Sequence, residues 1–212
     1  MKSIREAARF YLDNNFRPIP VYGPQMGCKC QNPEGCSDQC LGKVPIDRDW
    51  MDKDLYSPWD FPDGCNLALA MGKQQNGKWL LGVDFDGDIN VSDMLFLPPT
   101  LTVRSGRGYH MIYEVRPDCA LGNWVDVLGT RDKKTGYKGD VNGAIDFRYC
   151  RGALLAPPST HKSGKKYEWH NFTEPLMLPE DTLHRMRARY YRKHPNVKRH
   201  SSWRATHKDL KP

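Results

Sequence analysis

Two aspartates separated by one residue follow an apolar run in the middle of the chain, at Val83-Asp84-Phe85-Asp86. Successive side chains of a β-strand point to opposite faces, so a strand here would place Asp84 and Asp86 on one face, about 7 Å apart at Cα. Carboxylate oxygens are the ligands that Mg²⁺ and Mn²⁺ prefer. The alternative is that the pair caps a turn at Gly87.

A second segment, Ile145-Asp146-Phe147-Arg148, alternates in the same way and places Asp146 and Arg148 on one face. A two-metal site for phosphoryl transfer needs carboxylates on rigid elements that hold two ions roughly 3.5–4 Å apart. Three aspartates on two strands would provide them.

Two glycine- or proline-containing segments could bind phosphate. Arg104-Ser105-Gly106-Arg107-Gly108-Tyr109-His110 combines a hydroxyl, guanidinium groups, exposed backbone amides and an imidazole, all of which suit phosphate oxygens. Ala156-Pro157-Pro158-Ser159-Thr160-His161 has similar chemistry. The alternatives are an ordinary glycine-rich hairpin turn and a solvated loop histidine.

Four of the seven cysteines have the spacing C-x-C-x5-C-x3-C, at Cys28, Cys30, Cys36 and Cys40. An odd number of cysteines without an export signal argues against a disulfide framework. Four thiolates would close a tetrahedral site, which predicts a structural Zn²⁺ and leaves no open position for a zinc hydrolase. The alternative is a set of free thiols.

Hydrophobic periodicity predicts few helices and several short strands. We expect helices over 3–15, 49–55 and 179–192, strands over 66–71, 79–86, 101–104, 109–115, 144–148 and 153–156, and an exposed loop over 129–143. The segments 101–104 and 109–115 would form a hairpin, and 144–148 would pair with 153–156. Antiparallel hairpins therefore fit the chain better than a doubly wound parallel sheet, and the expected class is α+β.

The composition indicates a folded protein of one compact domain or two small lobes. The chain has 212 residues, 11% of them aromatic, and a mean hydropathy of −0.72. No apolar run approaches the roughly 20 residues of a membrane span, and the N-terminus has no signal peptide. We therefore expect a cytoplasmic protein.

Positive charge is concentrated at the C-terminus. Residues 185–212 contain ten Lys/Arg and one acidic residue, whereas the preceding 184 residues contain 22 Lys/Arg and 24 Asp/Glu. Basic residues mixed with aromatic ones suit a nucleic-acid backbone. A solvated linker to a further domain is the equal alternative.

The order of these segments resembles the bifunctional primase–polymerase domain of the archaeo-eukaryotic primase superfamily. The resemblance spans roughly residues 5–185 and includes Gly42-Lys43-x-Pro45 and Tyr167-Glu168-Trp169. It implies a two-lobed fold in which a modified RNA-recognition-motif sheet, mixed or antiparallel, carries the catalytic aspartates. It also implies attack of a 3′-hydroxyl on an α-phosphate.

The resemblance assigns roles to the residues above. Catalysis and the binding of two Mg²⁺ or Mn²⁺ ions would fall to Asp84, Asp86 and Asp146. Nucleotide binding would fall to Ser105, Arg107, His110, Arg148, Ser159, His161 and Lys43.

The domain and partner predictions follow from the same resemblance. Residues 1–184 would be the catalytic domain with the embedded cysteine loop 28–40, and residues 185–212 a basic arm or a linker to a helicase. Partners would be single-stranded DNA template, primer and NTP or dNTP, in phage or plasmid replication in a bacterial host. The alternative is a catalytically idle module that binds single-stranded nucleic acid. Three clustered carboxylates that repel one another without metal argue against it.

Overall fold

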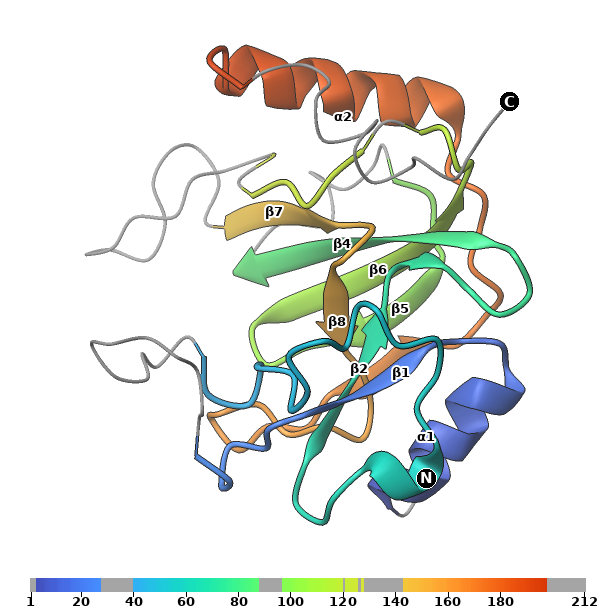
Figure 1. Ribbon diagram of the computed structural model, residues 1–212. Coiled ribbons are helices and arrows are strands. Elements are labelled where there is room, and N and C mark those ends of the chain that lie inside the picture. Colours follow the sequence, from blue (N-terminus) through green and yellow to red (C-terminus); the bar gives the residue numbers. More distant parts are fainter. Residues whose placement is uncertain are drawn as a thin grey trace.

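The computed structural model describes residues 3–27, 40–87, 97–119, 121–125, 127 and 143–197. Within these ranges the chain forms two α-helices, a short 3₁₀ helix and two β-sheets whose strand pairs are all antiparallel (Figure 1). The fold class is therefore α+β, as predicted.

Helix α1 (Ile4–Asp13) begins with the capping box that its sequence predicts. The Ser3 hydroxyl accepts a hydrogen bond from the Glu6 amide at 3.1 Å, and the Glu6 carboxylate accepts one from the Ser3 amide at 2.9 Å. These bonds satisfy two of the amide groups that a helix N-terminus leaves unpaired. The apolar side of α1 packs on the smaller sheet.

The smaller sheet has three strands in the order β1 (Pro18–Val21), β2 (Asn66–Ala70), β8 (Ala153–Leu155). Its edge strand β1 contains two prolines, which lack the amide that a central strand would need. The central strand β2 is buried along its whole length.

The larger sheet has six strands. Its main path runs β3 (Gly72–Lys73), β4 (Trp79–Gly87), β6 (Gly108–Val115), β5 (Leu101–Arg104) and β9 (Glu168–Asn171), and β7 (Gly143–Arg148) also pairs with β4. Strand β4 is thus paired on both edges, with β6 along one and with β3 and then β7 along the other.

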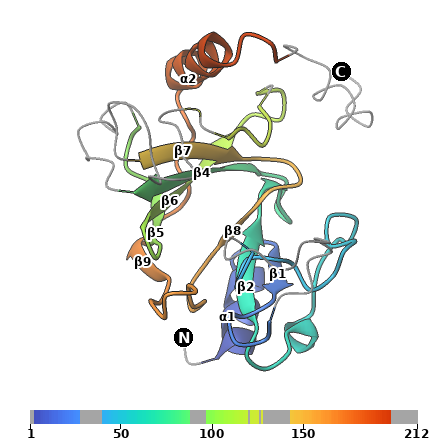
Figure 2. The same ribbon diagram turned by 90° about the vertical axis from the view of Figure 1, so that its left-hand side faces the viewer.

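The two faces of the larger sheet lie in different surroundings. Leu80 and Ile112 face a core shared with α1 and the smaller sheet. Val83, Phe85 and their odd-numbered neighbours face a second core, which is covered by helix α2 (Glu180–Lys193). Figure 2 shows this order of layers, with α2 on one side of the larger sheet and β1, β2 and α1 on the other. The even-numbered aspartates of β4 therefore face the smaller sheet.

The prediction that 144–148 pairs with 153–156 is wrong. Strand β7 pairs with β4 and strand β8 pairs with β2, so consecutive strands belong to different sheets. Packing between the sheets favours this arrangement: Leu154 fills the space above Gly82, where a Cβ would lie 2.3 Å from the leucine Cδ1. Contacts of this kind are long-range and leave no periodic signal in the sequence.

The predicted helix over 49–55 is also absent from the structure, where this segment forms turns. The Arg17 guanidinium donates hydrogen bonds to the carbonyl oxygens of Lys53 and Asp54, at 2.8 and 3.2 Å, and the Lys53 ammonium pairs with Asp47. These contacts with distant residues replace the bonds of a helix. The predicted loop 129–143 lies outside the described residues except for Gly143, which begins β7.

Candidate active site

The middle of β4 brings the predicted carboxylates together. Asp84 lies directly opposite His110 of β6 on one side and opposite Asp146 of β7 on the other. Residues directly opposite one another on antiparallel strands project from the same face, with Cβ atoms about 4.5–5.5 Å apart. Val83 and Phe85 point the other way and are fully buried. The two apolar side chains anchor β4 while its aspartates face the smaller sheet.

Asp86 follows on the same face of β4. It lies opposite Gly108 and Ala144, which present no side chain or only a methyl group. The Asp86 carboxylate therefore has room beside it and is partly exposed.

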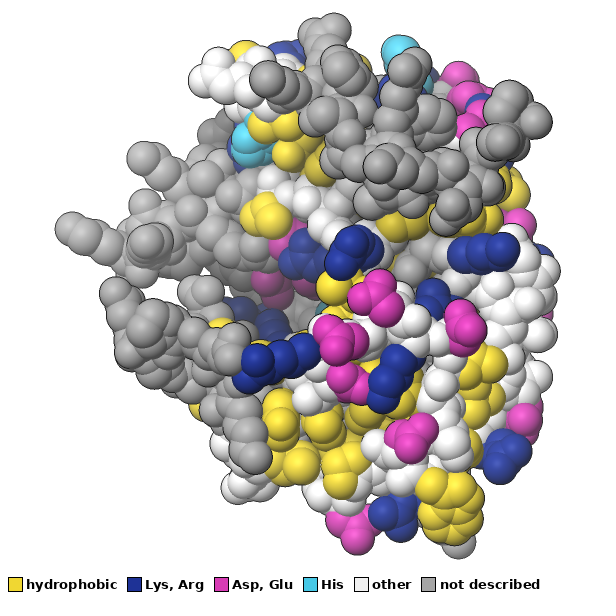
Figure 3. Space-filling view, in the orientation of Figure 1, with side chains coloured by type: hydrophobic (Ala, Val, Ile, Leu, Met, Phe, Trp, Pro, Cys, Tyr) yellow, Lys and Arg dark blue, Asp and Glu magenta, His cyan; other side chains and the backbone are white. Residues whose placement is uncertain are grey.

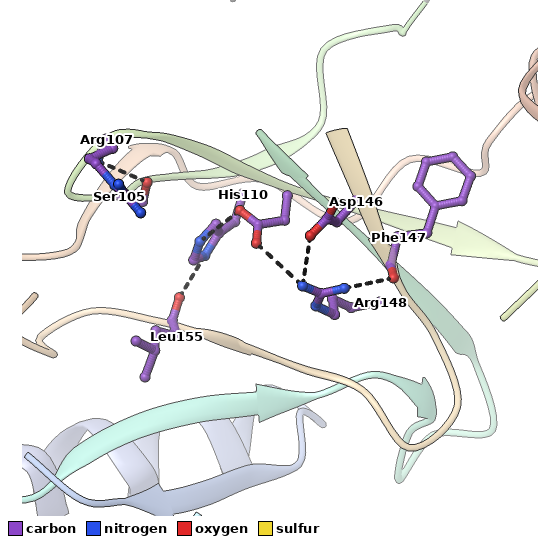
Figure 4. A network of polar contacts seen from close by, with 8 residues as sticks. Ser105, Arg107, His110, Asp146, Phe147, Arg148 and Leu155 are labelled. Carbon is purple, nitrogen blue, oxygen red and sulfur yellow. Dashed lines mark hydrogen bonds and ion pairs between the residues drawn. The ribbon is translucent and has the colours of Figure 1, made fainter. Parts of the chain in front are cut away.

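One guanidinium contacts both opposed carboxylates, and Figure 4 shows Arg148 beside Asp146. The Arg148 Nη2 atom donates a hydrogen bond to Asp146 Oδ2 at 2.9 Å and lies 4.0 Å from Asp84 Oδ2. The Asp146 side chain is fully buried, whereas that of Arg148 is 25% exposed. Arg148 is therefore the cation that these carboxylates share, and it can reach solvent.

His110 is held by its backbone partner in one orientation. Its Nδ1 lies 2.9 Å from the Leu155 carbonyl oxygen of β8, and because a carbonyl only accepts, Nδ1 carries a proton. The other ring nitrogen, Nε2, lies 3.5 Å from Asp84 Oδ1. The imidazole thus spans the two sheets and presents Nε2 to the carboxylates.

Burial disfavours the charged forms of the side chains in this cluster. Burial is the main cause that raises the pKa of the Asp84 carboxyl; Asp86 and Asp146 act in the same direction, and His110 and Arg148 oppose them. Burial also lowers the pKa of the His110 imidazole, against the attraction of Asp84. A further cation near Asp84 would therefore be stabilised.

The carboxylate oxygens are of the type that binds a hard divalent ion, but their present positions do not form a coordination site. Among the described residues, no three His, Cys, Asp or Glu side chains form a ready metal-binding group. The Arg148 nitrogen stands in for a cation between Asp84 and Asp146. If that side chain turned toward solvent, it would leave carboxylate oxygens of the kind that Mg²⁺ and Mn²⁺ bind.

A pocket of about 230 Å³ opens in front of this cluster. Asp84, His110 and Arg148 line it from the larger sheet, Lys43 lies across from them, and the rest of the wall is Ile19, Val21, Pro45, Ala68, Ala153, Leu154, Leu155 and Tyr167. Figure 3 shows acidic and basic side chains around a hollow at mid-height of the molecule. An anionic ligand here would meet Lys43 and Arg148, and a cation would meet Asp84.

The two segments predicted to bind phosphate lie against each other. A Cβ on Gly106 would lie 2.5 Å from the His161 ring, so only glycine permits this approach. The Ser105 hydroxyl accepts a hydrogen bond from the Arg107 amide at 3.4 Å, and the Arg107 side chain is exposed. The turn and the loop thus form one surface beside the pocket.

The imidazole of His161 has the opposite proton arrangement to that of His110. The Ser163 amide donates a hydrogen bond to His161 Nδ1 at 3.2 Å, so in the neutral ring Nε2 carries the proton. Burial is the main cause that lowers the pKa of His161, and Lys43 and Arg107 lower it further. His161 is therefore a neutral donor at Nε2 around neutral pH.

Ser159 does not reach the pocket. Its side chain is fully buried, and its hydroxyl accepts a hydrogen bond from the Leu67 amide and donates one to the Leu67 carbonyl, both at 2.8 Å. It joins the loop after β8 to the central strand β2.

Tyr167 lines the pocket and has no place in the site predicted from the sequence. Its ring lies 5.6 Å from that of His110 and 6.3 Å from that of His161, measured between centroids. The sequence signal was its position in Tyr167-Glu168-Trp169, just after the predicted loop. Nothing in that tripeptide shows that the ring would lie between two histidines.

The cysteine cluster can be followed only at its last residue. Cys40 is half-buried, and Cys28, Cys30 and Cys36 lie outside the described residues, so the zinc site stays a prediction. Cys65 and Cys119 are buried in the two cores.

Comparison with known families decides what this arrangement belongs to. The family model for the N-terminal domain of bifunctional DNA primase/polymerase matches residues 8–181. The chain belongs to this primase/polymerase family. A search of the curated proteins found no match.

The primase/polymerase match includes every described strand and ends just after α2 begins. Membership implies DNA primase and polymerase activity of the nucleotidyltransferase type, and with it the binding of nucleotides and nucleic acid. Among the described residues, neither helix has the length and apolar character needed to cross a membrane.

Proposed function

We propose that the chain catalyses template-directed nucleotidyl transfer, as a DNA primase and DNA polymerase that uses two divalent metal ions, in phage or plasmid replication. The observation that carries this proposal is the cross-strand row of Asp146, Asp84 and His110, which faces a pocket with Lys43 on its far side. An acidic row and a lysine that line the same pocket suit metal ions and a triphosphate together.

Asp84, Asp86 and Asp146 would hold Mg²⁺ or Mn²⁺. Bound there, the ions would activate the 3′-hydroxyl of the primer and neutralise charge on the triphosphate and its leaving pyrophosphate. The same site would prime when a second nucleotide takes the place of the primer end.

The surrounding donors would bind and orient the nucleotide. Lys43 and Arg148 would contact phosphate oxygens from opposite walls of the pocket, and Ser105 and Arg107 would contact them from the turn. His161 would donate a hydrogen bond through Nε2, and His110 would present Nε2 next to the carboxylates. Ser159 would act indirectly, by fixing the loop that carries His161.

Two further proposals concern the rest of the chain. Cys28, Cys30, Cys36 and Cys40 would hold a structural Zn²⁺ in the loop 28–40, and metal analysis of purified protein would detect it. Less than about half an equivalent of zinc in a preparation without chelator would contradict this assignment, since a filled four-thiolate site binds one ion. The catalytic domain would work with a fused or associated helicase.

Primer extension tests the proposal directly. We expect Asp84→Asn and Asp86→Asn, alone and together, to abolish extension of a primed template, because the carboxamide keeps the shape of the side chain and loses its charge. Asp63→Asn is the matched control, since the Asp63 side chain is 95% exposed. Circular dichroism would show that each variant folds.

The outcomes separate the candidate functions. Extension at the parent rate by the double variant would refute the carboxylate assignment. Absence of extension by the parent in both Mg²⁺ and Mn²⁺, with single-stranded DNA binding retained, would favour an idle binding module. Synthesis on an unprimed single strand would demonstrate priming separately from polymerisation.

A further inference from the structure

Helix α2 lies on the face of the larger sheet that points away from the candidate active site. Its inner side buries Leu183, Met186 and Tyr190 in the second core. The Tyr190 ring stacks in parallel on Trp124 at a centroid distance of 4.3 Å. The helix is thus fixed to the sheet, and the orientation of its outer side is set by this packing.

The outer side of α2 carries a row of three arginines along the helix axis. Arg185, Arg189 and Arg192 are exposed and spaced i, i+4, i+7, which places them in one row about 10 Å long. Within the described part of the chain, no carboxylate forms an ion pair with any of the three. The only acidic residues of the helix are Glu180 and Asp181 in its first turn.

Helix stability does not account for this row. Cations in the last turn interact favourably with the helix dipole, which explains Arg192 and Lys193. Arg185 and Arg189 lie outside that turn, and like charges four residues apart destabilise a helix by about 0.2–0.5 kcal/mol per pair. The repulsion between Arg185 and Arg189 therefore costs the helix a little stability, and Asp181, four residues before Arg185, offsets part of that cost.

A hollow of about 490 Å³ adjoins the row, lined by His184, Arg187, Ala188, Tyr191 and Arg192. Tyr191 is half-buried, and its ring meets Trp124 edge-on at 5.6 Å between centroids. An aromatic ring held in place beside guanidinium groups offers a stacking surface next to phosphate-binding donors. Such a combination suits single-stranded nucleic acid.

We propose that the outer face of α2 is a binding site for single-stranded nucleic acid, separate from the catalytic pocket. Arg185, Arg189 and Arg192 contact successive phosphates, and Tyr191 stacks on a base in the hollow. Because α2 and the catalytic aspartates lie on opposite sides of the larger sheet, this site holds a part of the strand remote from the reacting end.

The test uses the purified chain without nucleotide and without added Mg²⁺ or Mn²⁺, so that catalysis plays no part. Fluorescence anisotropy with a labelled 20-nucleotide oligothymidylate compares Arg185→Gln/Arg189→Gln with the charge-matched control Arg9→Gln/Lys73→Gln. Arg9 and Lys73 are exposed, on α1 and β3. All four substituted side chains are exposed, and thermal melting would verify that both variants fold.

We expect a change in the salt dependence of binding. Each phosphate contact on a single strand contributes about 0.7 to the slope of log K against log salt concentration, so loss of two contacts lowers the slope by about 1.4. The affinity of the α2 variant should fall about tenfold or more at low salt, with little change in the control variant. Tyr191→Leu should weaken binding roughly tenfold by loss of stacking.

Two results would overturn the proposal. One is the same slope and affinity in the α2 variant as in the control variant. The other is preferential binding of the parent to vesicles of anionic phospholipid, lost in the α2 variant, which would identify a membrane surface instead. A labelled RNA of equal length distinguishes RNA from DNA as the strand. If extension fails while α2-dependent strand binding persists, only the catalytic assignment is refuted.

Discussion

Replacing Arg148 by glutamine would remove the cation that Asp84 and Asp146 share. Removing one partner of a buried ion pair costs about 3–5 kcal/mol, because the other charge is left buried and unpaired. Arg148 is 25% exposed, so water can enter after the substitution and reduce the cost. We therefore expect a loss of about 2–3 kcal/mol in the free energy of unfolding without metal.

Urea denaturation without added Mg²⁺ or Mn²⁺ measures this loss. With a slope of about 2–3 kcal/mol per molar urea, the midpoint of Arg148→Gln should fall by about 1 M. Arg151→Gln is the control, since Arg151 is exposed on the turn after β7 and contacts neither aspartate.

Saturating Mn²⁺ should reduce the difference between parent and Arg148→Gln. An ion bound by the aspartates replaces the missing charge, and a ligand at a hundred times its Kd adds about 2.7 kcal/mol of stability. The parent should gain less from Mn²⁺, because its ion must displace the guanidinium. An equal loss with and without Mn²⁺ would refute the view that Arg148 stands in for a cation. Absence of any Mn²⁺ stabilisation in either protein would contradict the metal site itself.

Three other substitutions test the surroundings of the pocket. Ser159→Ala should lower the free energy of unfolding by about 1–3 kcal/mol, because it leaves the buried Leu67 amide unpaired; an unchanged urea midpoint would contradict its structural role. Gly106→Ala should weaken nucleotide binding, measured by calorimetry, because its methyl group displaces the His161 ring; unchanged affinity would separate that turn from the site. His161→Gln should reduce the loss of folding stability that the parent shows as the pH falls from 7 to 5. Its folded-state pKa is lowered, so the unfolded state binds more protons and the parent loses stability as pH falls below about 6.5. Urea midpoints measured from pH 7 to pH 5 that fall equally in both proteins would contradict this.

Local patterns predicted the parts of the site that lie on regular strands. The alternation in Val83-Asp84-Phe85-Asp86 is the alternation of β4, and the Gly106/Gly108 turn joins β5 and β6 as expected. The capping box at Ser3 is also formed as its sequence predicts. In each case the signal and the structure are set by residues close together in the chain.

Features that depend on distant partners were not predictable in this way. The ring of Tyr167 is placed by His110 and His161, and the Ser159 hydroxyl is turned inward by Leu67. Residue types in a loop indicate possible chemistry, but the packing of other elements decides which groups face the pocket.

The chain passes between the two sheets three times, and two of these connections are short. Met71 alone separates β2 from β3, and residues 149–152 separate β7 from β8. Strand β2 of the smaller sheet thus continues almost directly into β3 of the larger one, and β7 of the larger sheet continues into β8 of the smaller one. Unfolding should therefore be a single cooperative transition, in which tryptophan fluorescence and circular dichroism change together. The two walls of the pocket would then be lost together in one unfolding event, with no state in which one sheet persists alone.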